Sequence, residues 1–255
     1  MKPVQLLLTF LLFVAVRTAY AGEHITIAAA ADLKFAMDEI VGLFDKAHPG
    51  DQVITIYGSS GKFQTQIRQG APYDLYFSAD IAYPVALKAD GFAAGEVHPY
   101  ALGRIVLWSP SRQANTLSLS DLADPAIRRI AIANPKHAPY GMRAEEALKK
   151  AGLWDKVEPK LVYGENIAQT AQFVQTGNAD IGIIALSLAK SSELSRLGGY
   201  ALIPDSLHQP LEQGFVITRR AAGNPLALAF SRFMASADAR AIMIRYGFTL
   251  PGEEK

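Results

Sequence analysis

Hydrogen-bond donors gather where predicted strands give way to predicted helices. After an apolar strand pattern at 53–57 comes Gly58-Ser-Ser-Gly61, in which Ser59 and Ser60 carry hydroxyls and the glycines allow close backbone approach. The first residues of a helix expose N–H groups without intrahelical partners, and the helix dipole is positive there. Several such helix starts aimed at one point would bind an anion without Lys or Arg.

Three further helix starts have the same character. Ala31-Asp32 follows a strand pattern at 24–31, and the segments 134–141 and 164–167 follow strand patterns in the second half of the chain. Singly these signals are weak, because Asp, Ser and Asn are also ordinary helix N-cap residues. Two in each half of the chain together favour an anion site in a cleft.

Strands alternate with helices along the chain. Apolar patterns predict strands at 24–31, 53–57, 73–78, 103–109, 130–133, 160–163, 180–185 and 214–218. Helical spacing predicts helices at 33–48, 62–69, 81–89, 119–122, 141–151, 168–175 and 225–246. This alternation predicts an α/β fold with mostly parallel sheets and helices on both faces.

The alternation falls into two sets, before and after about Gly103, while the last strand and helices have no partner set of their own. We therefore expect two lobes, the first from residues 22–103 and 215–255 and the second from 104–214. Two crossing strands, near Arg104 and Phe215, would join them. A cleft between two such lobes is the natural place for a ligand.

The N-terminal residues predict export. Lys2 precedes a short apolar run at 4–16, and Ala19 and Ala21 complete a cleavage site, so residues 1–21 read as a signal peptide. The remaining chain keeps 23 of the 25 basic residues against 24 acidic ones, a net charge of −1, which gives no indication of nucleic-acid binding. There are no cysteines for disulfides or thiolate metal sites.

The sequence gives little support for a catalytic or cofactor-binding motif. The Gly-Ser-Ser-Gly-Lys62 run lacks the first glycine of a P-loop, and Phe63 stands where that motif needs Ser or Thr. The five histidines are scattered without metal-ligand spacing, so we predict no metal cation, no cofactor and no enzyme. The alternative is an exported enzyme that uses Asp32, His137 or Glu165 as acid–base groups.

Six stretches resemble a known family. They are 28–37, 57–62, 70–80, 134–141, 148–154 and 245–248, within which Gly-Ala-Pro-x-Asp-Leu-x-x-Ser-Ala-Asp and Ala-Pro-Tyr-Gly are specific in combination. Over nearly all of the chain beyond residue 21, the sequence resembles the periplasmic molybdate-binding proteins of ABC importers. The resemblance implies the two-lobe periplasmic binding protein fold with a hinged cleft.

The resemblance also implies a ligand and a partner. The ligand would be molybdate or tungstate, held by hydroxyls and backbone amides, and a monomeric protein in the periplasm would deliver it to an ABC permease. Carried over position by position, the ligand-binding residues are Ala31, Asp32, Ser59, Ser60, Tyr140 and Ile167, the last two through their amides. The alternative within this class is another oxyanion or a small anionic ligand.

Asp32 departs from the family pattern, which commonly has Ser, Thr or Asn at this position. An ionised carboxylate donates no hydrogen bond and repels a dianion. Asp32 could turn away as a helix cap and offer only its N–H, it could be protonated and donate, or the ligand could be something other than a simple dianion. We favour the helix cap, which is the commonest role of such an Asp.

Overall fold

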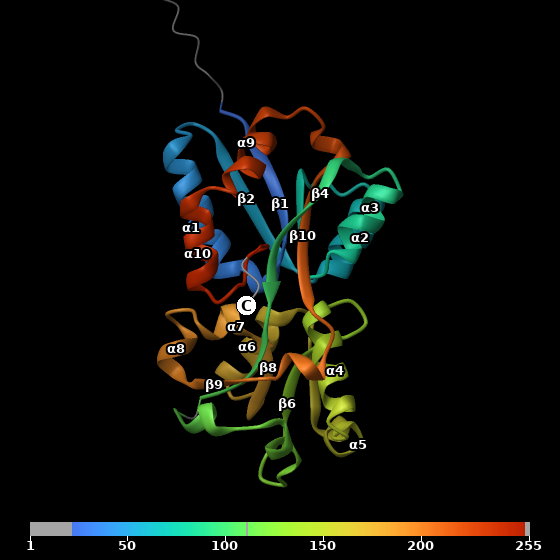
Figure 1. Cartoon of the computed structure of the whole chain (residues 1–255), viewed down its shortest axis with the longest axis vertical. Helices are drawn as coiled ribbons and strands as arrows, with labels where there is room; N and C mark the ends of the chain where they lie inside the picture. The colour runs from blue at the N-terminus through green and yellow to red at the C-terminus, as the bar shows by residue number, and fades with distance from the viewer. Residues whose placement is uncertain (1–21, 111, 253–255) are drawn as a thin grey trace, which may run out of the picture.

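Two five-stranded sheets organise the chain, one in each of two lobes that lie end to end (Figure 1). This computed structural model describes residues 22–110 and 112–252. The predicted signal peptide at 1–21 lies outside the described residues. No helix in the described part of the chain combines the length and the apolar character needed to cross a membrane.

The sheet of the first lobe has the strand order β2-β1-β3-β10-β4. Strands β1, β2 and β3 pair in parallel, and β10 lies antiparallel between β3 and β4. The bounds are β1 (His24–Ala30), β2 (Gln52–Gly58), β3 (Leu75–Ser78), β4 (Ala93–Gly103) and β10 (Leu211–Thr218).

The sheet of the second lobe repeats this pattern in the order β7-β6-β8-β5-β9. Here β6, β7 and β8 pair in parallel, and β5 lies antiparallel between β8 and β9. The bounds are β5 (Ile105–Ser109), β6 (Ile130–Ala133), β7 (Leu161–Gly164), β8 (Ile181–Ala185) and β9 (Gly199–Leu202). The predicted two-lobe α/β architecture is confirmed, with one reversed strand in each sheet.

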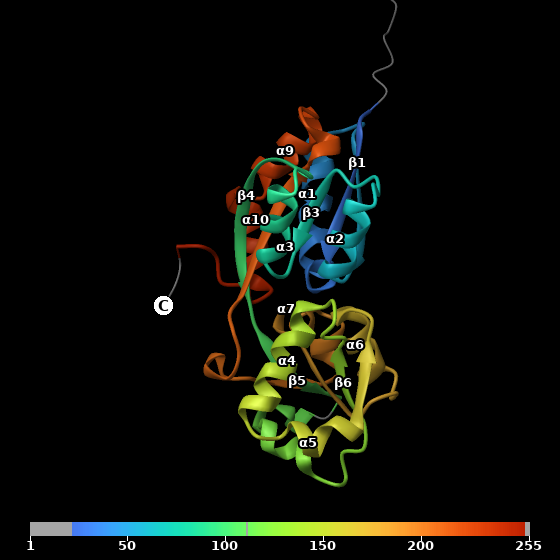
Figure 2. The same ribbon diagram turned by 90° about the vertical axis from the view of Figure 1, so that its right-hand side faces the viewer.

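The chain crosses between the lobes twice, as Figure 2 shows from the side. The first crossing is at Arg104, between β4 and β5, and the second lies between the end of β9 at Leu202 and the start of β10 at Leu211. Leu211 and Gln213, which we assigned to the second lobe, pair with β4 in the first sheet. The return therefore comes earlier in the sequence than Phe215.

Helices cover both faces of the first sheet and surround the second (Figure 1). In the first lobe these are α1 (Lys34–Ala47), α2 (Ser60–Arg68), α3 (Ala82–Ala89), α9 (Pro225–Phe233) and α10 (Ala237–Arg245). In the second lobe they are α4 (Pro139–Lys150), α5 (Trp154–Val157), α6 (Ile167–Gln175), α7 (Leu186–Ala189) and α8 (Leu194–Leu197). Short 3-10 turns are η1 (Ala31–Leu33), η2 (Arg112–Thr116), η3 (Leu119–Ala123), η4 (Glu158–Lys160), η5 (Asp205–Leu207) and η6 (Arg219–Ala221).

Side chains alternate across the first sheet as a pleated strand requires. On β3, Phe77 packs into the core beneath α1, α9 and α10, where its ring lies 4.5 Å from that of Phe215. The neighbouring Tyr76 is buried on the opposite face with residues of α2 and α3. The second lobe has its own core around the fully buried Trp108 of β5.

The structure differs from the sequence predictions in three elements. The single helix predicted at 225–246 is two helices, because the hydroxyl of Ser236 accepts the N–H of Ala239 and caps a new start at α10. Strands β4 and β9 were not predicted. The interior of β4 contains Gly95 and Pro99, residues that are tolerated in a strand at a sheet edge, where β4 lies.

Candidate functional site

The ends of neighbouring parallel strands bring the four predicted helix starts together. Ala30 pairs with Gly58 at the ends of β1 and β2, and Ala133 pairs with Gly164 at the ends of β6 and β7. Helices η1 and α2 begin just beyond the first pair, and α4 and α6 just beyond the second. The first lobe thus presents two helix starts to the cleft, and the second lobe presents two more.

All six residues predicted to bind the ligand line one pocket between the lobes. Its volume is about 10 Å³, which is roughly what a single water molecule needs. Its described lining contains no Lys or Arg. The lining residues are Ala30, Ala31, Asp32, Gly58, Ser59, Ser60, Ala79, Ala138, Pro139, Tyr140 and Ile167.

Three helix-terminal amides in this lining are free to donate. The N–H groups of Ser60, Tyr140 and Ile167 lie in the first turns of α2, α4 and α6, where no preceding carbonyl of the helix can bond them. None of the described hydrogen bonds uses them. Ser60 adds a hydroxyl, because its Oγ accepts the N–H of Ala79 at 3.0 Å and keeps its own hydrogen to donate.

The Asp32 side chain does not cap a helix. No side-chain cap bond is present at the start of η1 or of α1. Instead Oδ2 of Asp32 accepts the hydroxyl of Tyr140 at 2.9 Å and the side-chain amide of Gln213 at 2.8 Å. The predicted helix-cap role is therefore wrong, and the carboxyl group bridges the two lobes.

Burial dominates the electrostatics of Asp32, which is 1% exposed. Desolvation raises the pKa of its carboxyl to about 6, and hydrogen bonds from Gln213, from Tyr140 and from the backbone N–H groups of Asp32 and Leu33 act in the opposite direction. The same burial raises the pKa of Tyr140 well above its ordinary value, so the phenol stays protonated and donates.

The two strands next to the crossings, β4 and β10, both contact the cluster formed by Asp32 and Tyr140. Gln213 lies on β10, and its Nε2 also donates to the Tyr140 hydroxyl at 3.1 Å. Gly103 lies at the end of β4, where a Cβ atom would stand 2.4 Å from the Tyr140 hydroxyl and 2.7 Å from Gln213 Nε2. Sequence reasoning missed Gln213, and it gave Tyr140 a role for its amide but none for its side chain.

The lobes contact each other around the pocket. The N–H of Gly61 in α2 donates to the carbonyl of His137 at 2.9 Å, and Ser59 Oγ lies 2.9 Å from His137 Nδ1. On another side, the Ser187 hydroxyl donates to the backbone carbonyl of Asp32 at 2.7 Å. These bonds hold the two halves of the pocket against each other, so the structure is that of a closed cleft.

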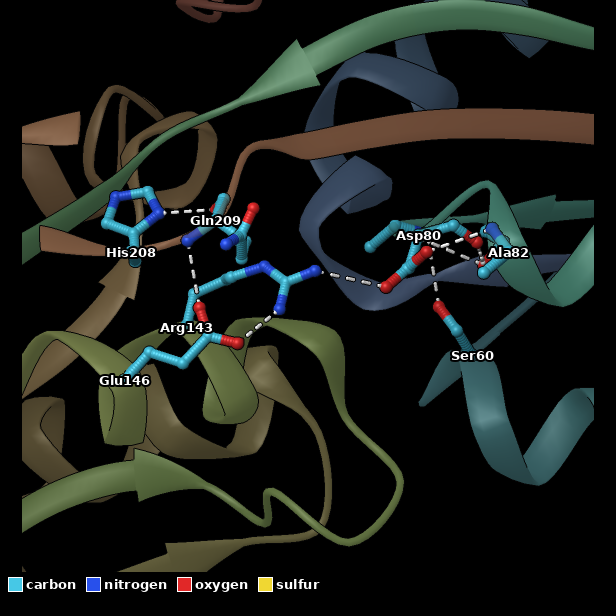
Figure 3. A network of polar contacts seen from close by, with 9 residues as sticks. Ser60, Asp80, Ala82, Arg143, Glu146, His208 and Gln209 are labelled. Atoms are coloured by element: carbon cyan, nitrogen blue, oxygen red, sulfur yellow. Dashed lines mark hydrogen bonds and ion pairs between the residues drawn. The ribbon is translucent and has the colours of Figure 1, made fainter. Parts of the chain in front are cut away.

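A network of ion pairs also joins the two lobes in this closed cleft (Figure 3). Arg143 of α4 reaches across the lobes to Asp80 at 3.2 Å and also pairs with Glu146 at 2.6 Å. Glu146 in turn accepts the N–H of Gln209, on the returning crossing segment, at 2.9 Å. Asp80 follows Ala79, whose N–H bonds Ser60, so the network begins directly behind the pocket.

Charges at the rim are paired. Lys62 and Glu165 form an ion pair across the lobes at 2.5 Å, with both side chains 40–50% exposed. His137 Nε2 lies 3.8 Å from Glu165, and burial lowers the pKa of this histidine, which favours its neutral form. Across the described residues, no cluster of His, Asp and Glu could hold a metal ion.

This architecture defines a class: two α/β lobes that close on a small pocket are the architecture of an extracellular solute-binding protein. The chain belongs to the bacterial extracellular solute-binding protein family, whose model matches residues 25–249. The molybdate-binding protein ModA of Azotobacter vinelandii is 37% identical over 234 residues, covering 91% of this chain and 92% of that protein. ModA of Rhodobacter capsulatus is 37% identical over 232 residues, covering 90% and 89%.

Solved structures agree. The periplasmic molybdate-binding protein of Azotobacter vinelandii superposes with a TM-score of 0.84 at 33% identity, covering 89% of this chain and 99% of that chain. A sulfate-binding protein of Mycobacterium tuberculosis has a TM-score of 0.77 at 16% identity, which shows a shared fold alone.

Proposed function

We propose that this protein binds molybdate or tungstate in the periplasm and delivers the oxyanion to an ABC permease. One observation carries the proposal. The free amides of Ser60, Tyr140 and Ile167 and the Ser60 hydroxyl line a single pocket between the lobes. Unpaired N–H groups at helix starts suit an anion, because they point at the ligand and the helix dipole is positive there. The 37% identity to molybdate-binding proteins supports the choice of ion.

Ligand binding in this proposal is a hinge closure. Ala31, Asp32, Ser59 and Ser60 would hold the anion from the first lobe, and Tyr140 and Ile167 would hold it from the second. A tetrahedral oxyanion is larger than the present pocket of about 10 Å³, so the pocket lining would move outward around the anion while the contacts between the lobes at its rim are kept. Sulfate shares the charge and shape of molybdate, and selectivity against it would come from the size to which the cleft closes.

Export and assembly complete the proposal. Residues 1–21 would direct the chain to the periplasm and be removed near Ala21, leaving a monomer to dock on the permease. The solved Azotobacter vinelandii relative, described as periplasmic, supports this location.

A catalytic role has one observation in its favour, the 2.9 Å contact of Ser59 with His137, which resembles a nucleophile and its base. A carboxylate that would orient this histidine as a base is not in place. Glu165 lies 3.8 Å from the histidine, beyond hydrogen-bonding distance, and is held by Lys62. We therefore propose a receptor that returns its ligand unchanged.

Thermal unfolding with different anions tests the function. Residues 22–255 should be heated with molybdate, tungstate, sulfate or phosphate and with no addition. Ligand at 1,000 times its dissociation constant stabilises a protein by about 4 kcal/mol, which is a shift of several degrees here. A shift with molybdate and tungstate alone supports the proposal, and no shift with either at millimolar concentration would refute it.

A further inference from the structure

The buried cluster around Asp32 contains fewer hydrogens than its acceptors need. Gln213 Nε2 gives its two hydrogens to Asp32 Oδ2 and to the Tyr140 hydroxyl oxygen, and Tyr140 gives its single hydrogen to Asp32 Oδ2. Every donor hydrogen of the three side chains is then used. Asp32 Oδ1 and Gln213 Oε1 remain buried with no partner in hydrogen-bonding geometry, although the backbone N–H groups of Asp32 and Leu33 lie close enough to the carboxyl to lower its pKa. Buried polar atoms are nearly always hydrogen-bonded, so this cluster lacks donor hydrogens for these two oxygens.

The surroundings offer no positive charge in place of those hydrogens. Tyr140 comes from α4, Gln213 from β10 and Tyr100 from β4, and all three are neutral, while α7 contributes only a hydroxyl to the Asp32 carbonyl. Among the described residues, no Lys, Arg or His forms an ion pair with Asp32. Lys34, two residues further on, is paired with Asp38 at 2.8 Å.

An anion in the pocket makes the shortage more severe. Asp32 lines the pocket and is itself buried, so a dianion would lie beside a poorly solvated carboxylate. Like charges disfavour each other strongly in such a place. A proton on Asp32 removes the repulsion and turns the unpartnered Oδ1 into a donor.

We propose that Asp32 is a proton-binding residue of the ligand site, and that closure on a dianion captures one proton from solvent at its carboxyl group. The inference rests on the proposed function and adds the species that binds: a dianion together with a proton. Burial already raises the pKa of this carboxyl to about 6 in the closed cleft, and a bound dianion raises it further. Above the pKa of the free protein, affinity then falls up to tenfold per pH unit.

Calorimetry counts the proton directly. Molybdate is titrated into residues 22–255 at about pH 7.5, above the pKa of Asp32, in HEPES and in Tris, whose ionisation enthalpies differ. Because captured protons come from the buffer, the difference in heat gives their number per anion. We expect an uptake approaching one proton in the wild-type protein and near zero in Asp32→Asn.

One control variant tests whether the proton binds at Asp32. Asp90→Asn removes a solvent-facing carboxylate of the first lobe, which pairs with Arg68 at 2.5 Å, and should keep the wild-type count.

Wild-type binding without proton uptake would overturn the inference and leave the proposed function intact, whereas no molybdate binding at all would contradict the function itself. A wild-type count retained in Asp32→Asn would also overturn the inference. The wild-type measurement decides even where a variant fails to fold.

Discussion

Replacing Gly61 by alanine is expected to stabilise the free protein and to weaken its binding of molybdate. Gly61 lies in the first turn of α2, and a Cβ atom there would meet His137 of the opposite lobe, at 2.8 Å from its carbonyl oxygen and 3.1 Å from its Cα. Both of these atoms are backbone, so neither can rotate away. The contact exists only while the lobes are closed, and an open cleft accommodates the methyl group freely.

The magnitudes follow from this geometry. Overpacking costs about 1–3 kcal/mol, and straining the Gly61–His137 hydrogen bond costs about another 1 kcal/mol. A combined cost of about 2–4 kcal/mol, borne only on closure, weakens binding about 30-fold to several hundred-fold. In the free protein, alanine is the better helix former by up to about 1 kcal/mol, which raises the unfolding temperature by at most about 2–4 °C.

Gly42→Ala is the matched control. Gly42 lies within α1 of the same lobe, and nothing stands within 4 Å of the Cβ that alanine would add. Both variants should unfold at a higher temperature than the wild-type protein, but only Gly61→Ala should lose affinity in a calorimetric titration with molybdate. Equal dissociation constants for the two variants would refute the reasoning that ligand binding requires this closed contact.

Three other predictions concern the cleft. Burial raises the pKa of Asp32 from 3.8 to about 6, so the contribution of this carboxyl to stability is present below pH 3.8 and is lost as the pH rises through 6. Asp32→Asn should therefore raise the free energy of unfolding by at most about 3 kcal/mol at neutral pH and by little near pH 4. Thermal unfolding measured across this pH range would test the difference. Arg143→Gln breaks the pair with Asp80 across the lobes and should weaken molybdate binding about fivefold to thirtyfold, while unchanged affinity would mean that the pair is not specific to the closed state. Lys62→Ala breaks the half-exposed pair with Glu165 and should change affinity less than about fivefold, with the difference vanishing at high salt; a larger effect that persists in salt would give Lys62 a direct role at the anion.

Local sequence signals predicted the parts of the site that are local. Ser59 and Ser60 lie beside a strand end and a helix start, and the Asn166 side chain accepts the N–H groups of Ala168 and Gln169, a capping pattern that marks the start of α6. Each of these features depends on neighbouring residues alone. That the helix starts converge follows from the parallel pairing of successive strands, which the alternation of elements also indicates.

The contacts between distant residues could not be predicted in this way. Gln213 is 181 residues from Asp32, and its side chain reaches the cluster only because β10 crosses between the lobes. A single glutamine in a strand carries no sign of such a partner. The preference of Asp for N-cap positions gave the wrong role for Asp32, because tertiary contacts with Tyr140 and Gln213 outweighed local capping.

The most direct test of the account is to locate the anion. Crystals of residues 22–255 grown with tungstate would show the heavy atom through its anomalous scattering. The account predicts one strong peak between the lobes, within hydrogen-bonding reach of the Ser60 hydroxyl and the amides of Tyr140 and Ile167. A loaded crystal with its only peak elsewhere, or with this pocket still closed to the present volume, would contradict it.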